Sequence, residues 1–151
     1  MLLKRSTIVL VLLVLLAGMA AASASAANVK KPVDNGVAVT HEKGLAPGTI
    51  MPMSISGSIA QGQSKWYSRA ISGYQTDMEI DLYWGNPSNS LSMTIYTPDG
   101  YVCGPYYDNC DGRLDGYIPC HLYRSSGLPK GTYYVKVYGY SVYGVQSFTL
   151  Y

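Results

Sequence analysis

The sequence has few charged residues and few of the residues that catalysis commonly uses. Only 13% of its 151 residues are charged, and it contains two histidines, three cysteines, two tryptophans and one phenylalanine. No Lys/Arg cluster forms the basic face that nucleic-acid phosphates require. The H-E-x-x-H pattern of zinc proteases and the G-x-S-x-G elbow of serine hydrolases are both missing. These absences argue against a nucleic-acid partner and against an enzyme.

A long apolar run occurs only near the N-terminus. Lys4 and Arg5 precede a continuous apolar run at residues 8–18, and small residues with A-x-A patterns follow as far as Ala26. This is the layout of a secretory signal peptide. The run is shorter than the roughly 18 residues of a membrane-spanning helix. We therefore expect residues 1–26 to be a cleaved signal peptide and the protein to be secreted or held at the cell surface. Membrane contact is then limited to export, unless the signal stays uncleaved.

Removal of the signal changes the charge balance. Without Lys4 and Arg5, nine basic residues remain against nine acidic ones, so the formal net charge of +2 belongs to the signal. The remaining 125 residues match the size of a single domain. Fifteen tyrosines and sixteen glycines favour pleated strands joined by turns.

The remaining chain divides into two parts. Residues 27–52 contain three prolines and three glycines without a sustained period, which predicts a tether or loosely packed arm with one short strand at 36–40. Residues 53–151 consist of short alternating segments separated by turns, such as the T-P-D-G turn at 97–100. We predict an all-β, jelly-roll-like antiparallel β-sandwich of about seven to eight strands, with no helix.

Three stretches together resemble a known family. They are "GSIAQGQSKWYSRAI", "LSMTIYTPDG" and "GLPKGTYYVKVYG", and in this order and spacing they resemble the pre-peptidase C-terminal (PPC) domain, which is similar to the collagen-binding domains of bacterial collagenases. The resemblance covers residues 56–151. It implies a jelly-roll-like sandwich that is a non-catalytic part of an exported protein, and some such domains bind calcium or a polymeric substrate. Within these 151 residues we expect no catalytic partner domain, which departs from the family's usual arrangement. It also has Ser92 and Thr94 where the family often has an acidic pair, so a metal site of that kind does not transfer to these positions.

The tyrosine-rich segment at 132–140 is the main candidate for a binding surface. Its inward face is predicted to carry Tyr133, Val135 and Val137. Its outward face is predicted to carry Tyr134, Lys136, Tyr138 and Tyr140. Exposed aromatic rows suit polysaccharide or protein-fibre ligands, because rigid rings give contact area at a small entropic cost. The alternative is cross-strand tyrosine pairing that only stabilises the sheet.

The segment at 77–84 alternates acidic and apolar residues. Its acidic face carries Asp77, Glu79 and Asp81. We expect Lys65 and Arg69, on the preceding segment, to lie opposite these carboxylates, because three like charges on one strand face repel one another.

The three cysteines allow one internal disulfide and one remaining thiol. A two-residue turn at Asp111-Gly112 predicts a hairpin in which Cys103 faces Cys120 at a non-hydrogen-bonded site, leaving Cys110 free or intermolecular. A competing turn at Asp115-Gly116 instead places Cys120 opposite Asp111. The first turn favours the disulfide between Cys103 and Cys120.

The same loop carries a candidate calcium site. Asp108, Asp111 and Asp115, with Asn109 nearby, supply the oxygen ligands that calcium requires. The spacing differs from an EF-hand, because Cys110 interrupts it and no glutamate follows. Asp and Gly are also ordinary turn residues, so the alternative is that the loop is only a hairpin tip.

These patterns predict a non-catalytic binding module that acts outside the cell. Its partner is expected to be an extracellular polymer or a cell-surface component, with calcium as the one candidate cofactor. One alternative is a structural component of an extracellular envelope or matrix, assembled through edge strands or through Cys110. Another is a small secreted enzyme whose catalytic residues come from distant strands.

Overall fold

A computed structural model of the protein describes residues 36–41 and 54–151. The predicted signal peptide and most of the predicted arm lie outside these described residues. The described ranges contain eleven β-strands and no helix, and therefore no helix long and apolar enough to cross a membrane. The strands are β1 (Ala38–Thr40), β2 (Ile55–Ala60), β3 (Ser64–Ile71), β4 (Asp77–Glu79), β5 (Leu82–Tyr83), β6 (Ser90–Tyr96), β7 (Val102–Tyr107), β8 (Tyr117–Ile118), β9 (His121–Tyr123), β10 (Gly131–Ser141) and β11 (Val145–Leu150).

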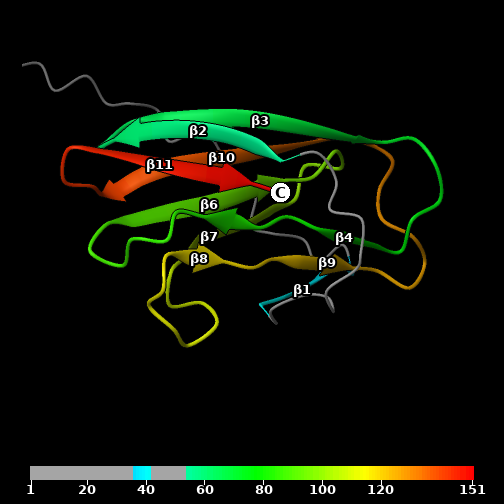
Figure 1. Ribbon diagram of the computed structural model, residues 1–151. Helices are drawn as coiled ribbons and strands as arrows, with labels where there is room; N and C mark the ends of the chain where they lie inside the picture. The colour runs from blue at the N-terminus through cyan, green and yellow to red at the C-terminus, as the bar shows by residue number, and fades with distance from the viewer. Residues whose placement is uncertain (1–35, 42–53) are drawn as a thin grey trace, which may run out of the picture. The chain divides into compact units, whose positions relative to one another are not determined.

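The strands form three antiparallel sheets (Figure 1). Two have four strands, in the orders β3-β10-β6-β7 and β2-β11-β5-β8, and a third has the order β1-β9-β4. Side chains from all three sheets meet in one hydrophobic core. The fold is thus the all-β antiparallel sandwich that the alternating sequence predicts. It has more than the expected seven to eight strands, because the segments at 77–84 and 117–123 are each divided into two short strands.

The period of two along each strand decides which side chains enter the core. On β10, Tyr133, Val135 and Val137 are 0–3% exposed, as predicted. On β6 the side chains of Leu91, Met93 and Ile95 are completely buried. Burying an aliphatic side chain contributes about 1.5–3 kcal/mol, so these two neighbouring strands supply much of the driving force for the sandwich.

One long ribbon connects the small sheet to the sandwich. Strands β4 and β5 pair with β9 and β8 in a single antiparallel register, interrupted where Asp81 lies opposite Pro119. Proline has no backbone N–H to donate, so the ladder cannot continue there. The break is closed by the Ile80 N–H, which donates to the Cys120 carbonyl at 2.9 Å, and by the Cys120 N–H, which donates to the Asp81 carboxylate at 3.3 Å.

This ribbon shows that the predicted hairpin through Asp111-Gly112 is wrong. Strand β7 pairs with β6 across the turn at 97–100, and residues 117–123 pair with 77–83 instead. The predicted register between Cys103 and Cys120 is therefore absent. Both cysteines are buried free thiols. The Asp-Gly turn signal is local, whereas residues 117–123 pair with β4 and β5, which lie much earlier in the chain.

The short strand expected at 36–40 is present as β1. It pairs with β9, so that Val39 lies opposite Leu122, and Val37 just before it is 8% exposed in the core. This part of the predicted arm therefore belongs to the folded structure.

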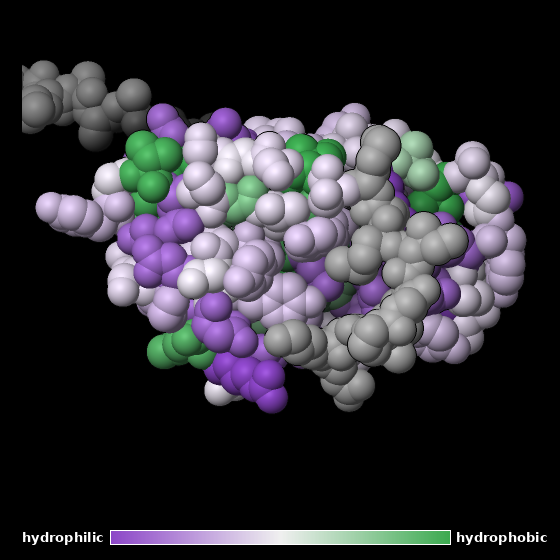
Figure 2. Space-filling view, in the orientation of Figure 1, coloured by the Kyte–Doolittle hydropathy of each residue, from purple (hydrophilic) through white to green (hydrophobic). Residues whose placement is uncertain are grey.

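The outward face of β2 and β11 is rich in hydroxyl groups. Ser56 lies opposite Thr149 and Ser58 opposite Ser147. Figure 2 shows that residues of intermediate hydropathy dominate this side, while strongly hydrophobic residues occur in separate small patches.

Candidate functional site

The outward face of the β3-β10-β6-β7 sheet carries six aromatic side chains from four adjacent strands. Antiparallel register places Trp66 opposite Lys136, Tyr134 opposite Tyr96, and Tyr107 opposite Ser92. We call this surface the aromatic face and define it as Trp66, Tyr96, Tyr107, Tyr134, Lys136, Tyr138 and Tyr140.

Two rings of the aromatic face meet above the central strand. Trp66 on β3 and Tyr96 on β6 lie on either side of β10, yet their ring centroids are only 5.3 Å apart, with 39° between the planes. The Lys136 Nζ atom lies 5.9 Å from the Trp66 ring centroid and 5.5 Å from that of Tyr138. A lysine within about 6 Å of an aromatic centroid is attracted by the negative ring face. The face is therefore ordered before any ligand arrives.

The same rings remain open to solvent. Trp66, Tyr134 and Tyr140 are 55%, 51% and 53% exposed. At the far end of the face Tyr140 packs edge-on against Tyr107, with centroids 4.9 Å apart. These two tyrosines border a surface hollow of about 400 Å³ that Leu114 also lines. Cross-strand pairing thus accounts for the ring contacts. It leaves about half of the surface of Trp66, Tyr134 and Tyr140 available for binding.

The face is nearly free of charge. Among the outward positions of β3, β6, β7 and β10, Lys136 is the only charged residue. The other groups are aromatic rings, phenolic hydroxyls, serines and threonines. Such a surface can stack on the apolar side of a sugar or on peptide side chains, and its hydroxyls can pair with polar groups at the rim.

The sequence identified part of this face. Tyr134, Lys136, Tyr138 and Tyr140 lie outward as predicted, because they alternate with buried residues on one strand. Three further aromatic members were missed: Trp66, Tyr96 and Tyr107. They come from other strands and join the face through sheet order. The alternation of "SKWYSRAI" is the one signal that could have placed Trp66 outward.

The three aspartates of the loop have separate roles. The Asp108 side chain is 3% exposed, and its Oδ1 accepts backbone N–H groups from Asp115, Gly116 and Tyr117 at 3.3, 2.9 and 3.1 Å. Asp111 Oδ1 accepts the Arg113 N–H at 3.0 Å in a local turn. Asp108, at the start of the loop, therefore holds the end of the loop at residues 115–117 through hydrogen bonds.

Asp115 is the third predicted calcium ligand. Its Oδ1 is a buried side-chain oxygen with no hydrogen-bond partner among the described residues. No group of three or more His, Cys, Asp or Glu side chains that could hold a metal ion occurs within 36–41 and 54–151. Calcium binding by Asp108, Asp111 and Asp115 stays a prediction.

A Cys-His contact is the other chemically notable feature. The Cys120 Sγ lies 3.6 Å from Nδ1 of His41, and this nitrogen is also 2.8 Å from the Pro119 carbonyl oxygen. Cys120 is only 1% exposed, and burial raises the pKa of its thiol well above the usual value. Burial likewise raises the pKa of Cys103 and of Cys110 to about 11. All three groups are thiols at neutral pH, whereas a nucleophile must be a thiolate.

The neighbours of the acidic strand differ from those that the sequence predicts. Lys65 and Arg69 do not lie opposite it in the sheet, because β3 pairs with β10, but Nη1 of Arg69 donates to the backbone carbonyl of Glu79 at 3.1 Å. The partner strand β9 instead supplies His121, whose Nε2 is 3.9 Å from a carboxylate oxygen of Asp77.

At the break in the ribbon the Asp81 carboxylate accepts the Tyr117 hydroxyl at 2.6 Å. Burial raises the pKa of Asp81, an effect that the hydrogen bonds from Tyr117 and Cys120 partly offset. Burial also raises the pKa of the Tyr117 hydroxyl far above its usual value, and the hydrogen bond to Asp81 raises it further. This pair has a structural role at the ladder break.

Comparison with known proteins gives little functional information. No protein-family model matches the chain. A stretch of 47 residues, 31% of the chain, is 43% identical to an uncharacterized protein of Archaeoglobus fulgidus, and the chain spans 65% of that protein's length. The resemblance to the PPC domain is not addressed by these comparisons and stays a prediction.

Proposed function

We propose that the protein is an exported, non-catalytic binding module that holds an extracellular polysaccharide or protein fibre against its aromatic face. The observation that carries this proposal is the Trp66–Tyr96 pair, which bridges the central strand while Trp66 stays 55% exposed. A half-exposed ring held by its neighbour loses little conformational freedom when a ligand stacks on it.

The size and charge of the face support a polymeric ligand. The rings occur on four adjacent strands, about 4.8 Å apart, so a single small molecule covers only part of the face. Lys136 is its only charged residue, which suits a neutral polymer or one with scattered acidic groups. The resemblance to the PPC domain supports the same type of partner.

The proposal is tested by retention on immobilised polymers. We expect the protein to be retained on at least one insoluble polysaccharide or fibrous protein, and Trp66→Ala to weaken retention about tenfold or more, as truncation of a central aromatic contact does. The matched control is Tyr143→Ala, because Tyr143 is 96% exposed but lies outside the aromatic face. Equal losses in the two variants would contradict binding through this face.

A structural role in an extracellular envelope or matrix is the second candidate. The observation that favours it is β3, an eight-residue strand at the edge of its sheet, which pairs only with β10 in the described part of the chain. Unpaired strand edges are templates for pairing with another chain. Cys110 is the most exposed of the three thiols and could link two copies.

Sedimentation velocity distinguishes the two candidates. A monomer over a hundredfold concentration range, together with retention on a polymer, supports the binding module. Ordered self-association without retention on any polymer, or a dimer on non-reducing gels that Cys110→Ser abolishes, supports the structural role.

A further inference from the structure

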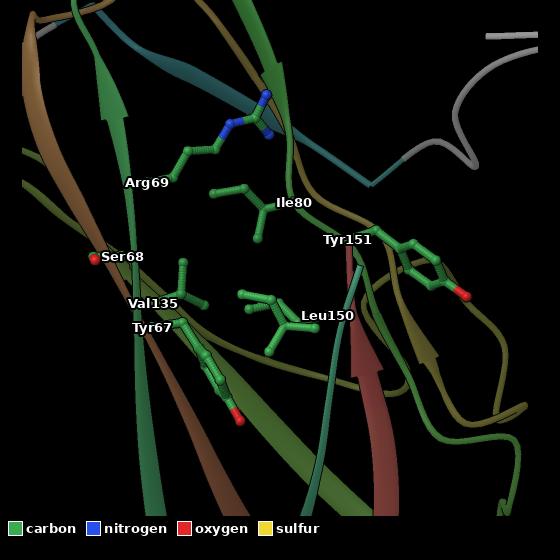
Figure 3. Close-up of a pocket in the computed structure, with 8 residues that line it drawn as sticks. Tyr67, Ser68, Arg69, Ile80, Val135, Leu150 and Tyr151 are labelled. Carbon is green, nitrogen blue, oxygen red and sulfur yellow. The ribbon is translucent and has the colours of Figure 1, made fainter. Parts of the chain in front are cut away.

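A cavity lies inside the sandwich, away from the aromatic face. An open-ended cavity of about 250 Å³ separates the two four-stranded sheets where β2 and β3 form their outer strands. Side chains from five segments line it: Ile55, Tyr67, Ile80, Val135 and Leu150. Figure 3 shows Ile80, Val135 and Leu150 projecting into this space from different elements.

The cavity is large enough for an organic ligand. An apolar cavity of about 150 Å³ in another protein stays dry and binds benzene. The space here is larger, and its walls are mainly apolar: Ile80, Val135 and Leu150 are 2%, 3% and 6% exposed. Transfer of an alkyl or aryl group from water into this space is favourable, and little free energy is needed to open the cavity because it already exists.

One end of the cavity carries a cation. Arg69 lines it and follows Tyr67 by two residues on β3, so both side chains lie on the inward side of the strand, whereas Trp66 lies on the outward side. Nη1 of Arg69 donates to the Glu79 backbone carbonyl at 3.1 Å, which fixes the position of the guanidinium. No described acidic side chain forms an ion pair with Arg69. A guanidinium has five N–H donors, and most of those of Arg69 are therefore left for a ligand.

We propose that this cavity binds a small carboxylate amphiphile, with its alkyl or aryl group between the sheets and its carboxylate on Arg69. The planar guanidinium fork matches a carboxylate with two parallel hydrogen bonds, and such charge-assisted bonds are stronger than neutral ones. An apolar pocket with a single convergent charged group is the usual form of a small-molecule site. This site is independent of the aromatic face and of its proposed polymer.

The test uses three ligands with the same chain and different headgroups: octanoate, octan-1-ol and octylammonium. Binding is followed in the purified protein through the methyl NMR signals of Ile80, Val135 and Leu150. We expect octanoate to shift these signals saturably and to bind about tenfold more tightly than octan-1-ol, as expected for a hydrogen bond to a charged group. Octylammonium should bind more weakly than both.

Two charge variants locate the headgroup. Arg69→Met should reduce the affinity for octanoate about tenfold and leave that for octan-1-ol unchanged. The matched control is Lys65→Met, which removes one positive charge from the same side of the same strand but does not line this cavity. Equal effects of the two substitutions would overturn the proposal, because they would indicate a general charge effect.

A cavity-filling variant locates the apolar group. Leu150→Phe should lower the affinity for octanoate and for octan-1-ol to the same extent, because the added ring occupies the cavity. If circular dichroism shows that this variant is unfolded, Ile55→Phe replaces it, since Ile55 is 39% exposed at the rim and tolerates a larger side chain. Full octanoate affinity in a folded variant, or no saturable shift in the native protein, would overturn the proposal.

Discussion

Asp108 is a buried carboxylate whose single oxygen accepts three consecutive backbone N–H groups. Its sequence context, between tyrosines and an Asn-Cys-Asp turn, suggests a metal ligand as readily as a structural anchor. The difference lies in what surrounds it after folding, because backbone donors seven to nine residues later converge on the side chain.

Asp108→Ala is therefore expected to destabilise the protein by roughly 2–4 kcal/mol, since it leaves buried N–H groups without an acceptor. Chemical denaturation measures the change in the free energy of unfolding. Asp111→Ala, which loses one turn bond, serves as the control and should cost about 0.5 kcal/mol or less. A neutral effect of Asp108→Ala would show that the loop does not depend on this carboxylate.

Asp81 makes stability depend on pH. Burial raises its pKa in the folded protein, so folding favours the protonated carboxyl. The stabilising contribution is complete below the pKa of the unfolded chain, about 3.9, and is lost as pH rises through the raised folded value. The contribution of Asp81 to the free energy of unfolding should therefore decline from about pH 4 upward.

Asp81→Asn should remove this part of the decline, because an amide stays neutral and can still bond to Tyr117 and to the Cys120 N–H. Urea unfolding at several pH values between 4 and 7 provides the measurement. Asp111→Asn is the control for removing one carboxylate. An unchanged pH slope in Asp81→Asn would assign the dependence to another group.

Strand β10 lies close to the turn between β2 and β3 at Gly139. The Gly139 N–H donates to the Gln63 carbonyl, and the Gly62 N–H donates to the Gly139 carbonyl, at 3.0 and 2.9 Å. A Cβ atom at Gly139 would clash with the Ala60 carbonyl oxygen, so no side chain fits without moving the backbone.

Gly139→Ala should accordingly destabilise the protein by about 3 kcal/mol, at the upper end of the range for overpacking. Gly73→Ala is the matched control, because nothing lies within 4 Å of its Cβ position. Thermal and urea unfolding of the two variants give the comparison. Similar unfolding midpoints would mean that the turn moves aside at little cost.

The elements also show how far local sequence determines this fold. Alternation predicts the buried faces of β6 and β10, and the turn at 97–100 joins β6 to β7 as expected. Alternation shows which side of a strand is buried, but it does not say which strand lies beside it. For this reason the partner of 117–123 was predicted wrongly, and the hairpin register of Cys103 with Cys120 failed with it.

In the candidate site, too, features within one strand could be predicted and contacts between strands could not. The outward row on β10 could be predicted, because its members belong to one strand. The contact between Trp66 and Tyr96 could not, because the two residues are 30 positions apart and meet only once sheet order places β10 between their strands.

For the whole molecule, the candidate calcium site can be tested through its effect on stability. If Asp108, Asp111 and Asp115 bind the ion in the folded state only, calcium must raise the unfolding temperature relative to a chelator. The gain is about 2.7 kcal/mol at a hundredfold excess over the dissociation constant. Scanning calorimetry measures it, and Asp115→Asn should abolish it. Identical midpoints with calcium and with chelator would contradict calcium binding.

The two tryptophans of the chain lie in opposite surroundings. Trp66 is 55% exposed on the aromatic face, whereas Trp84 is 6% exposed and its Nε1 donates to the carbonyls of Asn86 and Asn89. The protein thus contains two tryptophan fluorophores, one solvated and one enclosed. Quenching of the long-wavelength emission should report a ligand on the face, and a red shift of the short-wavelength emission should report loosening of the interior. A single optical titration can therefore distinguish occupancy from unfolding without an attached dye.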